Sequence, residues 1–156
     1  MKRIEFCKFH GFGNDYIVFE AESLVDISRS VSDFAIKVCH RHRGIGGDGL
    51  AVLETHLGDP AADYSCRIIN PDGSEAGFSG NGTRCAVAYL YYKNLWRDKS
   101  LKLRTKSGVK TYEFLEGDEQ TFWFRAELGK PKFANDEIPF ASGERLSSIT
   151  NYELRI

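Results

Sequence analysis

The segment at residues 83–92 constrains the fold more than any other part of the sequence. It predicts a helix, and apolar side chains occupy nearly every face of that helix. A helix without a polar face is buried on most of its sides, because no stripe is left for solvent. Lys93 and Asn94 follow it, and both residue types favour a helix C-terminus. The rest of the chain must therefore enclose this helix.

Strand patterns lie on both sides of the segment. The first twenty residues indicate two strands around the turn HGFGND, because positions 16–20 are rich in β-branched and aromatic residues. A shorter amphipathic helix is predicted from a cap at Ser30 or Ser32 to an end at Gly44. Further strands are predicted at 50–54, 64–70, 101–108, 109–115 and 121–128.

Together these elements predict an α+β fold. The chain has 156 residues, which fits one domain with its own core, so we expect residues 1–156 to form a single domain. Many strands and one enclosed helix favour a curved, barrel-like β-sheet, mixed or antiparallel, wrapped around a central buried helix.

Composition narrows the class of partner. The formal net charge is -1, which gives no electrostatic footprint for nucleic acid or for an acidic membrane. The first residues, MKRIEFCKFHGFGNDY, lack the apolar run and cleavage site of a signal peptide. No later stretch approaches the roughly 20 apolar residues that a membrane span needs. We therefore expect a cytoplasmic protein whose partner is a small molecule or another protein.

The cysteines predict neither a disulfide framework nor a metal site. Their spacing is irregular and contains no C-x-x-C pair, so we expect free thiols, most of them buried. The stretch CHRH at 39–42 crowds one cysteine and two histidines together, but neighbours at this spacing on a helix do not converge on one ion. The four cysteines are Cys7, Cys39, Cys66 and Cys85.

Two other motifs have ordinary interpretations. The stretch GIGGDG at 44–49 matches G-x-G-x-x-G, but it follows a predicted helix and opens a strand, the reverse of the dinucleotide-binding order. Its glycines favour a sharp turn or a close approach of the backbone to a ligand. The acceptor pattern for glycosylation at 81–83 is a chance match, because no secretory signal accompanies it.

The stretch GFSGNGTRC at 77–85 predicts a binding site. It places the hydroxyl of Ser79 on a glycine-flanked turn that opens directly into the buried helix. Gly80, Asn81 and Gly82 would leave amide N–H groups at a helix N-terminus, where the helix dipole favours a carboxylate or phosphate. The alternative is an ordinary N-cap, in which the side chain of Ser79 or Asn81 satisfies the first-turn amides.

Four motifs together resemble the amino-terminal half of the diaminopimelate epimerase family. In order they are FCKFHGFGNDY, RHRGIGGDGL, RIINPDGSEAGFSGNGTRCAVAYL and TKSG. The resemblance implies a cytoplasmic isomerase of lysine and peptidoglycan-precursor biosynthesis that inverts an α-carbon of diaminopimelate. It implies no pyridoxal phosphate, no other cofactor and no metal. A thiolate would remove the α-proton, and a thiol on the opposite face would return one.

The same resemblance assigns roles to particular residues. Asn14 and Asn70 would bind polar groups of an amino-acid substrate, and Gly80 and Asn81 would offer backbone amides to its α-carboxylate. Gly49 stands where some members have a side chain that reaches the substrate and many have glycine.

One catalytic position departs from the family motif. Ser79 occupies the place of the catalytic cysteine, whereas Cys85 matches a second cysteine that is buried in the helix. A thiol with a pKa of about 8.5 can become a thiolate near neutral pH at a helix N-terminus. An alcohol is a far weaker acid and cannot serve as that base. We therefore expect the serine, whether natural or engineered, to keep the shape of the site and lose its proton chemistry.

The family's second catalytic cysteine and its Glu-Arg pair have no equivalent before residue 156. We therefore expect either a fragment of a protein about twice as long or a stand-alone half, with a missing second domain as the natural partner. The surface left uncovered would also favour a homodimer. Two functions stay open: an amino-acid epimerase that is inactive as this isolated chain, and a non-catalytic module that binds a carboxylate or amino acid.

Overall fold

The computed structural model describes residues 3–25, 30–55, 60–134, 137–138 and 147–148. Within these residues the strands form one sheet in the order β1-β2-β3-β4-β6-β7-β8, and β5 pairs with β4 outside this path. The strands are β1 (Cys7–Gly11), β2 (Asn14–Glu20), β3 (Gly49–Thr55), β4 (Tyr64–Ile69), β5 (Glu75–Ala76), β6 (Ser100–Thr105), β7 (Gly108–Gly117) and β8 (Phe122–Glu127).

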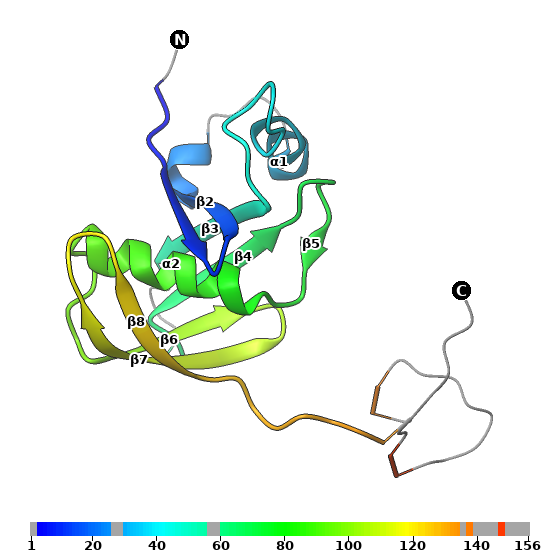
Figure 1. Ribbon diagram of the computed structural model, residues 1–156, viewed down its shortest axis with the longest axis vertical. Coiled ribbons are helices and arrows are strands. Elements are labelled where there is room, and N and C mark those ends of the chain that lie inside the picture. The colour runs from blue at the N-terminus through cyan, green and yellow to red at the C-terminus, as the bar shows by residue number, and fades with distance from the viewer. Residues whose placement is uncertain (1–2, 26–29, 56–59, 135–136, 139–146, 149–156) are drawn as a thin grey trace.

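The sheet is mixed and curled, as the sequence predicts. β2 pairs with β3 in parallel and β4 pairs with β6 in parallel, whereas the remaining pairs are antiparallel. Figure 1 shows the strands curving around the helix α2 (Gly80–Tyr92). The predicted α+β class and the enclosed central helix are therefore confirmed.

The helix α2 forms the centre of the core. Val87 and Leu90 are fully buried, and Tyr91 is only partly exposed. The helix begins at Gly80, three residues earlier than its apolar pattern predicts, because Ser79 supplies the N-cap. At its other end Asn94 has a φ of 56°, the left-handed conformation that asparagine tolerates beyond a helix C-terminus.

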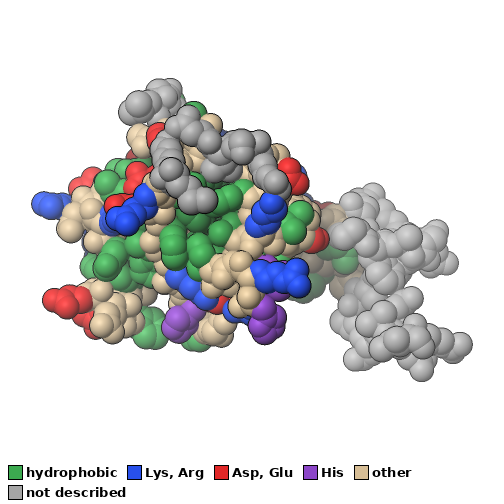
Figure 2. Space-filling view, turned by 90° about the horizontal axis from the view of Figure 1, so that it is seen from above, with side chains coloured by type: hydrophobic (Ala, Val, Ile, Leu, Met, Phe, Trp, Pro, Cys, Tyr) green, Lys and Arg blue, Asp and Glu red, His purple; other side chains and the backbone are tan. Residues whose placement is uncertain are grey.

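Alternate residues of the central strands face two different helices. One face of the sheet packs on α2, and the other packs on α1 (Val31–Val38) and on the short 3₁₀ helix η1 (Ala21–Leu24). This two-sided burial explains why β2 and β3 are nearly continuous apolar runs. Figure 2 shows the molecule from the side of α1, where hydrophobic side chains gather in the middle of the face among charged ones.

The helix α1 is shorter than the sequence predicts. Ser30 caps it by accepting a hydrogen bond from the Asp33 amide at 3.1 Å, but it ends at Val38 and does not reach Gly44. Beyond Val38 the chain folds back, and the Gly46 amide donates to the Val38 carbonyl at 2.9 Å. A Cβ at Gly44 would lie 2.2 Å from the Lys37 carbonyl oxygen. The close return of the backbone therefore ends the helix and requires glycine at 44.

Candidate functional site

The starts of β2 and β3, the end of β4 and the start of α2 gather at one end of the sheet. Tyr16 of β2 pairs with Gly49 at the start of β3, and the antiparallel strand β4 ends beside that start. Asn14 is the first residue of β2, and Asn70 directly follows β4. The strand register therefore brings two of the sequence-predicted site residues to the same end of the sheet.

Ser79 caps α2 at this end. Its Oγ accepts a hydrogen bond from the Gly82 amide at 3.1 Å, and its carbonyl accepts from the Thr83 amide at 2.9 Å. The amides of Gly80 and Asn81 have no acceptor among the described residues. The N-cap interpretation of Ser79 is therefore confirmed, and two first-turn amides still remain open to an anion.

The ring of Tyr16 lies against the start of α2. Its hydroxyl lies 2.9 Å from Ser79 Oγ, and its side chain is almost completely buried. A Cβ at Gly49 would lie 2.8 Å from the Tyr16 ring, and a Cβ at Gly82 would lie 2.9 Å from it. Glycine at both positions therefore makes room for the tyrosine, which explains why position 49 carries no side chain directed at a ligand.

A buried hydrogen-bond chain holds Ser79 from the other side. The Tyr112 hydroxyl of β7 donates to Thr83 Oγ1 at 2.6 Å. The Thr83 hydroxyl in turn donates to the Ser79 carbonyl at 2.7 Å. Tyr112 and Thr83 are fully buried, and burial raises the pKa of Tyr112 to about 12. The phenol therefore stays protonated and anchors the start of α2 to the sheet.

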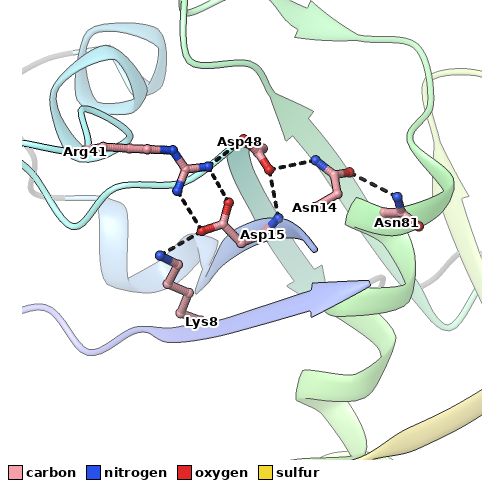
Figure 3. Close-up of polar contacts among 6 residues, drawn as sticks. All are labelled: Lys8, Asn14, Asp15, Arg41, Asp48 and Asn81. Carbon is pink, nitrogen blue, oxygen red and sulfur yellow. Dashed lines mark hydrogen bonds and ion pairs between the residues drawn. The ribbon is translucent and has the colours of Figure 1, made fainter. Parts of the chain in front are cut away.

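The side chain of Asn14 bridges Asp48, the residue directly before β3, and the helix α2. Its Nδ2 donates to Asp48 Oδ2 at 2.9 Å, and its Oδ1 accepts from Asn81 Nδ2 at 3.1 Å (Figure 3). The same oxygen of Asp48 accepts from the Asp15 backbone amide at 3.0 Å. The structure therefore joins two predicted site residues, Asn14 and Asn81, through their side chains.

Charged residues extend this network away from α2. Arg41 lies 2.7 Å from Asp15 Oδ1 and 2.6 Å from Asp48 Oδ1, and Lys8 lies 2.8 Å from Asp15 Oδ2 (Figure 3). The hydrogen bond from Arg41 is the main cause that holds the pKa of Asp15 well below its ordinary value, and Lys8 adds to it. Asp15 is thus ionised and fixed at neutral pH.

Arg84 adds a positive charge beside the start of α2. Its guanidinium donates to Asn81 Oδ1 and lies 5.9 Å from the ring centroid of Phe12. Phe12 is 87% exposed and has a φ of 55°, so it stands out from the turn between β1 and β2. The predicted anion site therefore has a cation at its rim.

Asn70 is placed differently from the other predicted residues. Its backbone amide donates to the Ser74 carbonyl at 2.8 Å, and its Nδ2 donates to Ser74 Oγ at 3.0 Å. These bonds lie within its own turn, so the side chain makes no direct bond to Asn14 or Asn81. Asn70 shares the sheet end with them, and its contact with a ligand stays a prediction.

The sequence interpretation missed three residues of the network. Tyr16 entered only as part of a strand, Asp48 only as part of a glycine motif, and Arg41 only as a neighbour of two histidines. An aspartate directly before a buried strand and an Asn-Asp pair at the start of another were the available signals. Only the parallel pairing of β2 with β3 shows that these signals belong to one site.

The cysteines are free thiols, and most are buried. Burial raises the pKa of Cys85 to about 12, so this thiol stays protonated at neutral pH, as expected for a buried cysteine. In CHRH, Cys39 is buried whereas His40 and His42 are exposed. Within the described ranges, no three His, Cys, Asp or Glu side chains gather closely enough to hold a metal ion. No helix in that part of the chain is long and apolar enough to cross a membrane.

The fold is similar to part of two solved isomerase structures. A probable proline racemase from Agrobacterium radiobacter K84 superposes with a TM-score of 0.63 at 18% identity, over 83% of this chain and 42% of the racemase. A methylitaconate-delta-isomerase superposes with a TM-score of 0.61 at 13% identity, over 75% of this chain and 35% of the isomerase. At these identities the likeness defines the fold class and nothing more.

The sequence comparisons define the family within that class. Residues 6–134 match the diaminopimelate epimerase family. The diaminopimelate epimerase of Pelotomaculum thermopropionicum is 38% identical over 136 residues, 87% of this chain and 48% of the relative. The diaminopimelate epimerase of Caldanaerobacter subterraneus subsp. tengcongensis is 40% identical over 140 residues, which are 89% of this chain and 48% of the relative. The chain belongs to the diaminopimelate epimerase family, and it spans about half the length of the curated relatives it matches.

Proposed function

We propose that this chain supplies one half of the active site of a cofactor-independent amino-acid epimerase. The proposed substrate is diaminopimelate or a closely similar amino acid, and the proposed setting is cytoplasmic lysine and peptidoglycan-precursor biosynthesis. A second domain would face the start of α2 and complete the site. We call this chain joined to such a domain the full-length protein. The expected homodimer stays a separate prediction, which analytical ultracentrifugation tests.

The start of α2 is the observation that carries the proposal. Gly80 and Asn81 present amides with no acceptor among the described residues, at the end of a helix whose dipole favours an anion. Asn14 adjoins them through Asn81. In the proposed complex the two amides hold the α-carboxylate, and Asn14 and Asn70 contact other polar groups of the substrate.

Ser79 has the catalytic role in this proposal. It would face one side of the substrate's α-carbon, at the position of the family cysteine. Inversion needs an acid and a base on opposite faces of that carbon, so half a site cannot perform it. An alcohol is also a poor base, so the isolated chain is expected to be inactive.

A non-catalytic role is the second candidate. Ser79 Oγ already accepts from the Gly82 amide and lies 2.9 Å from the Tyr16 hydroxyl, so it serves as a structural cap. A module that binds a carboxylate or an amino acid needs this cap and the open amides, but no proton transfer.

Amide chemical shifts of the chain, titrated with diaminopimelate, test the binding site that both candidates share. We expect the largest shifts at Gly80 and Asn81, with weak affinity because half of the contacts are missing. The control ligand is 1,5-diaminopentane, which keeps both amines and lacks both carboxylates, and it should leave these amides unmoved. Shifts confined to other parts of the chain, or equal shifts with the diamine, would exclude this site.

A further inference from the structure

The hydroxyl groups of Tyr16 and Ser79 lie 2.9 Å apart, although the residues are 63 positions apart in the sequence. Either oxygen can be the donor in this pair. A serine hydroxyl has one proton and two acceptor lone pairs, and the Gly82 amide already uses one of these lone pairs. The second lone pair can accept a hydrogen bond from the Tyr16 hydroxyl. The proton of Ser79 itself is then free to point toward a ligand.

The surroundings of Tyr16 hold its hydroxyl in this place. The side chain is only 5% exposed, and its ring occupies the space left by Gly49 and Gly82. Among the described residues, Ser79 is the only hydrogen-bond partner of this phenol. Moving the ring would therefore leave a cavity in the core, and no other described group competes with Ser79 for the Tyr16 hydroxyl.

We infer that Tyr16 is a positioning residue that donates a proton to Ser79 and stabilises the negative charge that develops on it. The inference rests on the proposed function, in which Ser79 faces the α-carbon. A phenol is a much stronger acid than an aliphatic alcohol, so it holds that charge better than serine alone. Tyr16 thus supplies part of the acidity that the missing thiol would have provided.

The proton transfer balances as follows. The Ser79 O–H bond breaks, and its proton forms a C–H bond with the electron pair of the α-carbanion. The Tyr16 proton passes to Ser79 Oγ, which leaves a phenolate at Tyr16. The base of the second domain takes up the proton that left the opposite face of the carbon. After product release, the base gives up its proton to solvent and the phenolate takes a proton from solvent, which restores both groups for the next turnover.

Exchange of the α-hydrogen of diaminopimelate in D₂O tests the inference in the full-length protein. Tyr16→Phe keeps the ring that fills the space between the two glycines, so the fold is retained. We expect the exchange rate to fall by about 10- to 100-fold in the Ser79 protein, with little change in KM. In the Ser79→Cys background we expect less than about a 3-fold fall, because a thiol is acidic enough without the phenol.

Tyr89→Phe is the matched control. It removes another buried phenol of the core, one that donates to Glu20 at the far end of β2 and makes no bond to Ser79. The control should change exchange by less than about 2-fold in both backgrounds. Equal losses from Tyr16→Phe in the two backgrounds would mean that Tyr16 only supports the fold. Unchanged exchange in the Ser79 protein would overturn the inference.

A second measurement needs no enzymatic activity. In the chain that carries Ser79→Cys, the Tyr16 hydroxyl would donate to the introduced thiolate and lower its pKa. Adding Tyr16→Phe should therefore slow alkylation of that thiol at pH 7 by severalfold, whereas Tyr89→Phe should not. Slower alkylation in the Tyr16→Phe variant, together with no α-hydrogen exchange in the full-length protein, would refute the proposed epimerase activity but support the Tyr16 contact. Equal alkylation rates at every pH with Tyr and with Phe at position 16 would refute the contact itself.

Discussion

Asp48 fixes which way the side-chain amide of Asn14 points. Its Oδ2 lies 2.9 Å from Asn14 Nδ2, so the carbonyl end of that amide is directed at Asn81. A carboxylate can only accept at this position, and turning the amide over would place two acceptors face to face. The pair therefore fixes the orientation of the Asn14 amide beside the start of α2.

The first prediction concerns Asp48→Asn. This change removes the charge that bonds Asn14 and Arg41, and we expect the free energy of unfolding to fall by about 1.5–3 kcal/mol. Glu75→Gln is the control, because it breaks the exposed ion pair with Arg67, which should be worth less than about 1 kcal/mol. Urea denaturation measures both. Equal losses would mean that the Asp48 network is an ordinary surface contact.

Acid should weaken the fold partly through Asp15. The folded pKa of this carboxyl is lowered, chiefly by Arg41 and then by Lys8. Its contribution to stability is therefore complete above the unfolded pKa of about 3.9 and is lost as the pH falls toward the folded value. Asp15→Asn should flatten stability against pH below about pH 5, and Arg41→Gln should do nearly the same. Parallel curves for wild type and both variants would contradict the assignment.

Glycine should be required at position 82 but not at position 80. A Cβ at Gly82 would lie 2.9 Å from both Tyr16 and Ile68, so Gly82→Ala should cost about 1–3 kcal/mol by overpacking. The nearest atom to a Cβ at Gly80 is 3.7 Å away, and alanine favours a helix by about 0.5–1 kcal/mol over glycine. Gly80→Ala should therefore leave the melting temperature unchanged or higher. If Gly80→Ala lost as much stability as Gly82→Ala, contact with the Tyr16 ring would not explain the cost at position 82.

Thiol reactivity should follow burial. Burial raises the pKa of Cys39 to about 11 and that of Cys85 to about 12, and it also raises the pKa of Cys66. Cys7 is the one cysteine with partial exposure. Brief alkylation of the folded chain at pH 8, mapped by mass spectrometry, should modify Cys7 first and the other three only after unfolding. Rapid labelling of Cys85 would show that the start of α2 opens readily.

The core was predictable from the sequence, but the site was predictable only in part. The apolar faces of 83–92 required an enclosed helix, and the glycine-flanked turn located its start near Ser79. Periodicity could not show that the chain folds back beyond Val38. That fold-back depends on hydrogen bonds from the backbone amides of Gly46 and Gly47 to carbonyls at the end of α1, eight residues earlier in the chain. Nor could it show Tyr16 against Ser79, since that contact depends on how β2 lies beside α2.

Exchange of the α-hydrogen of diaminopimelate in D₂O, followed by mass spectrometry, tests the central claim most directly. The isolated chain should show no detectable exchange, and the full-length protein with Ser79 should exchange slowly at best. Ser79→Cys in the full-length protein should raise the rate by about 10²–10⁴-fold, because a thiol at this helix start provides the missing acid–base group. No exchange from either full-length form would favour the binding module, and brisk exchange by the serine form that Ser79→Cys leaves unchanged would contradict the role assigned to Ser79.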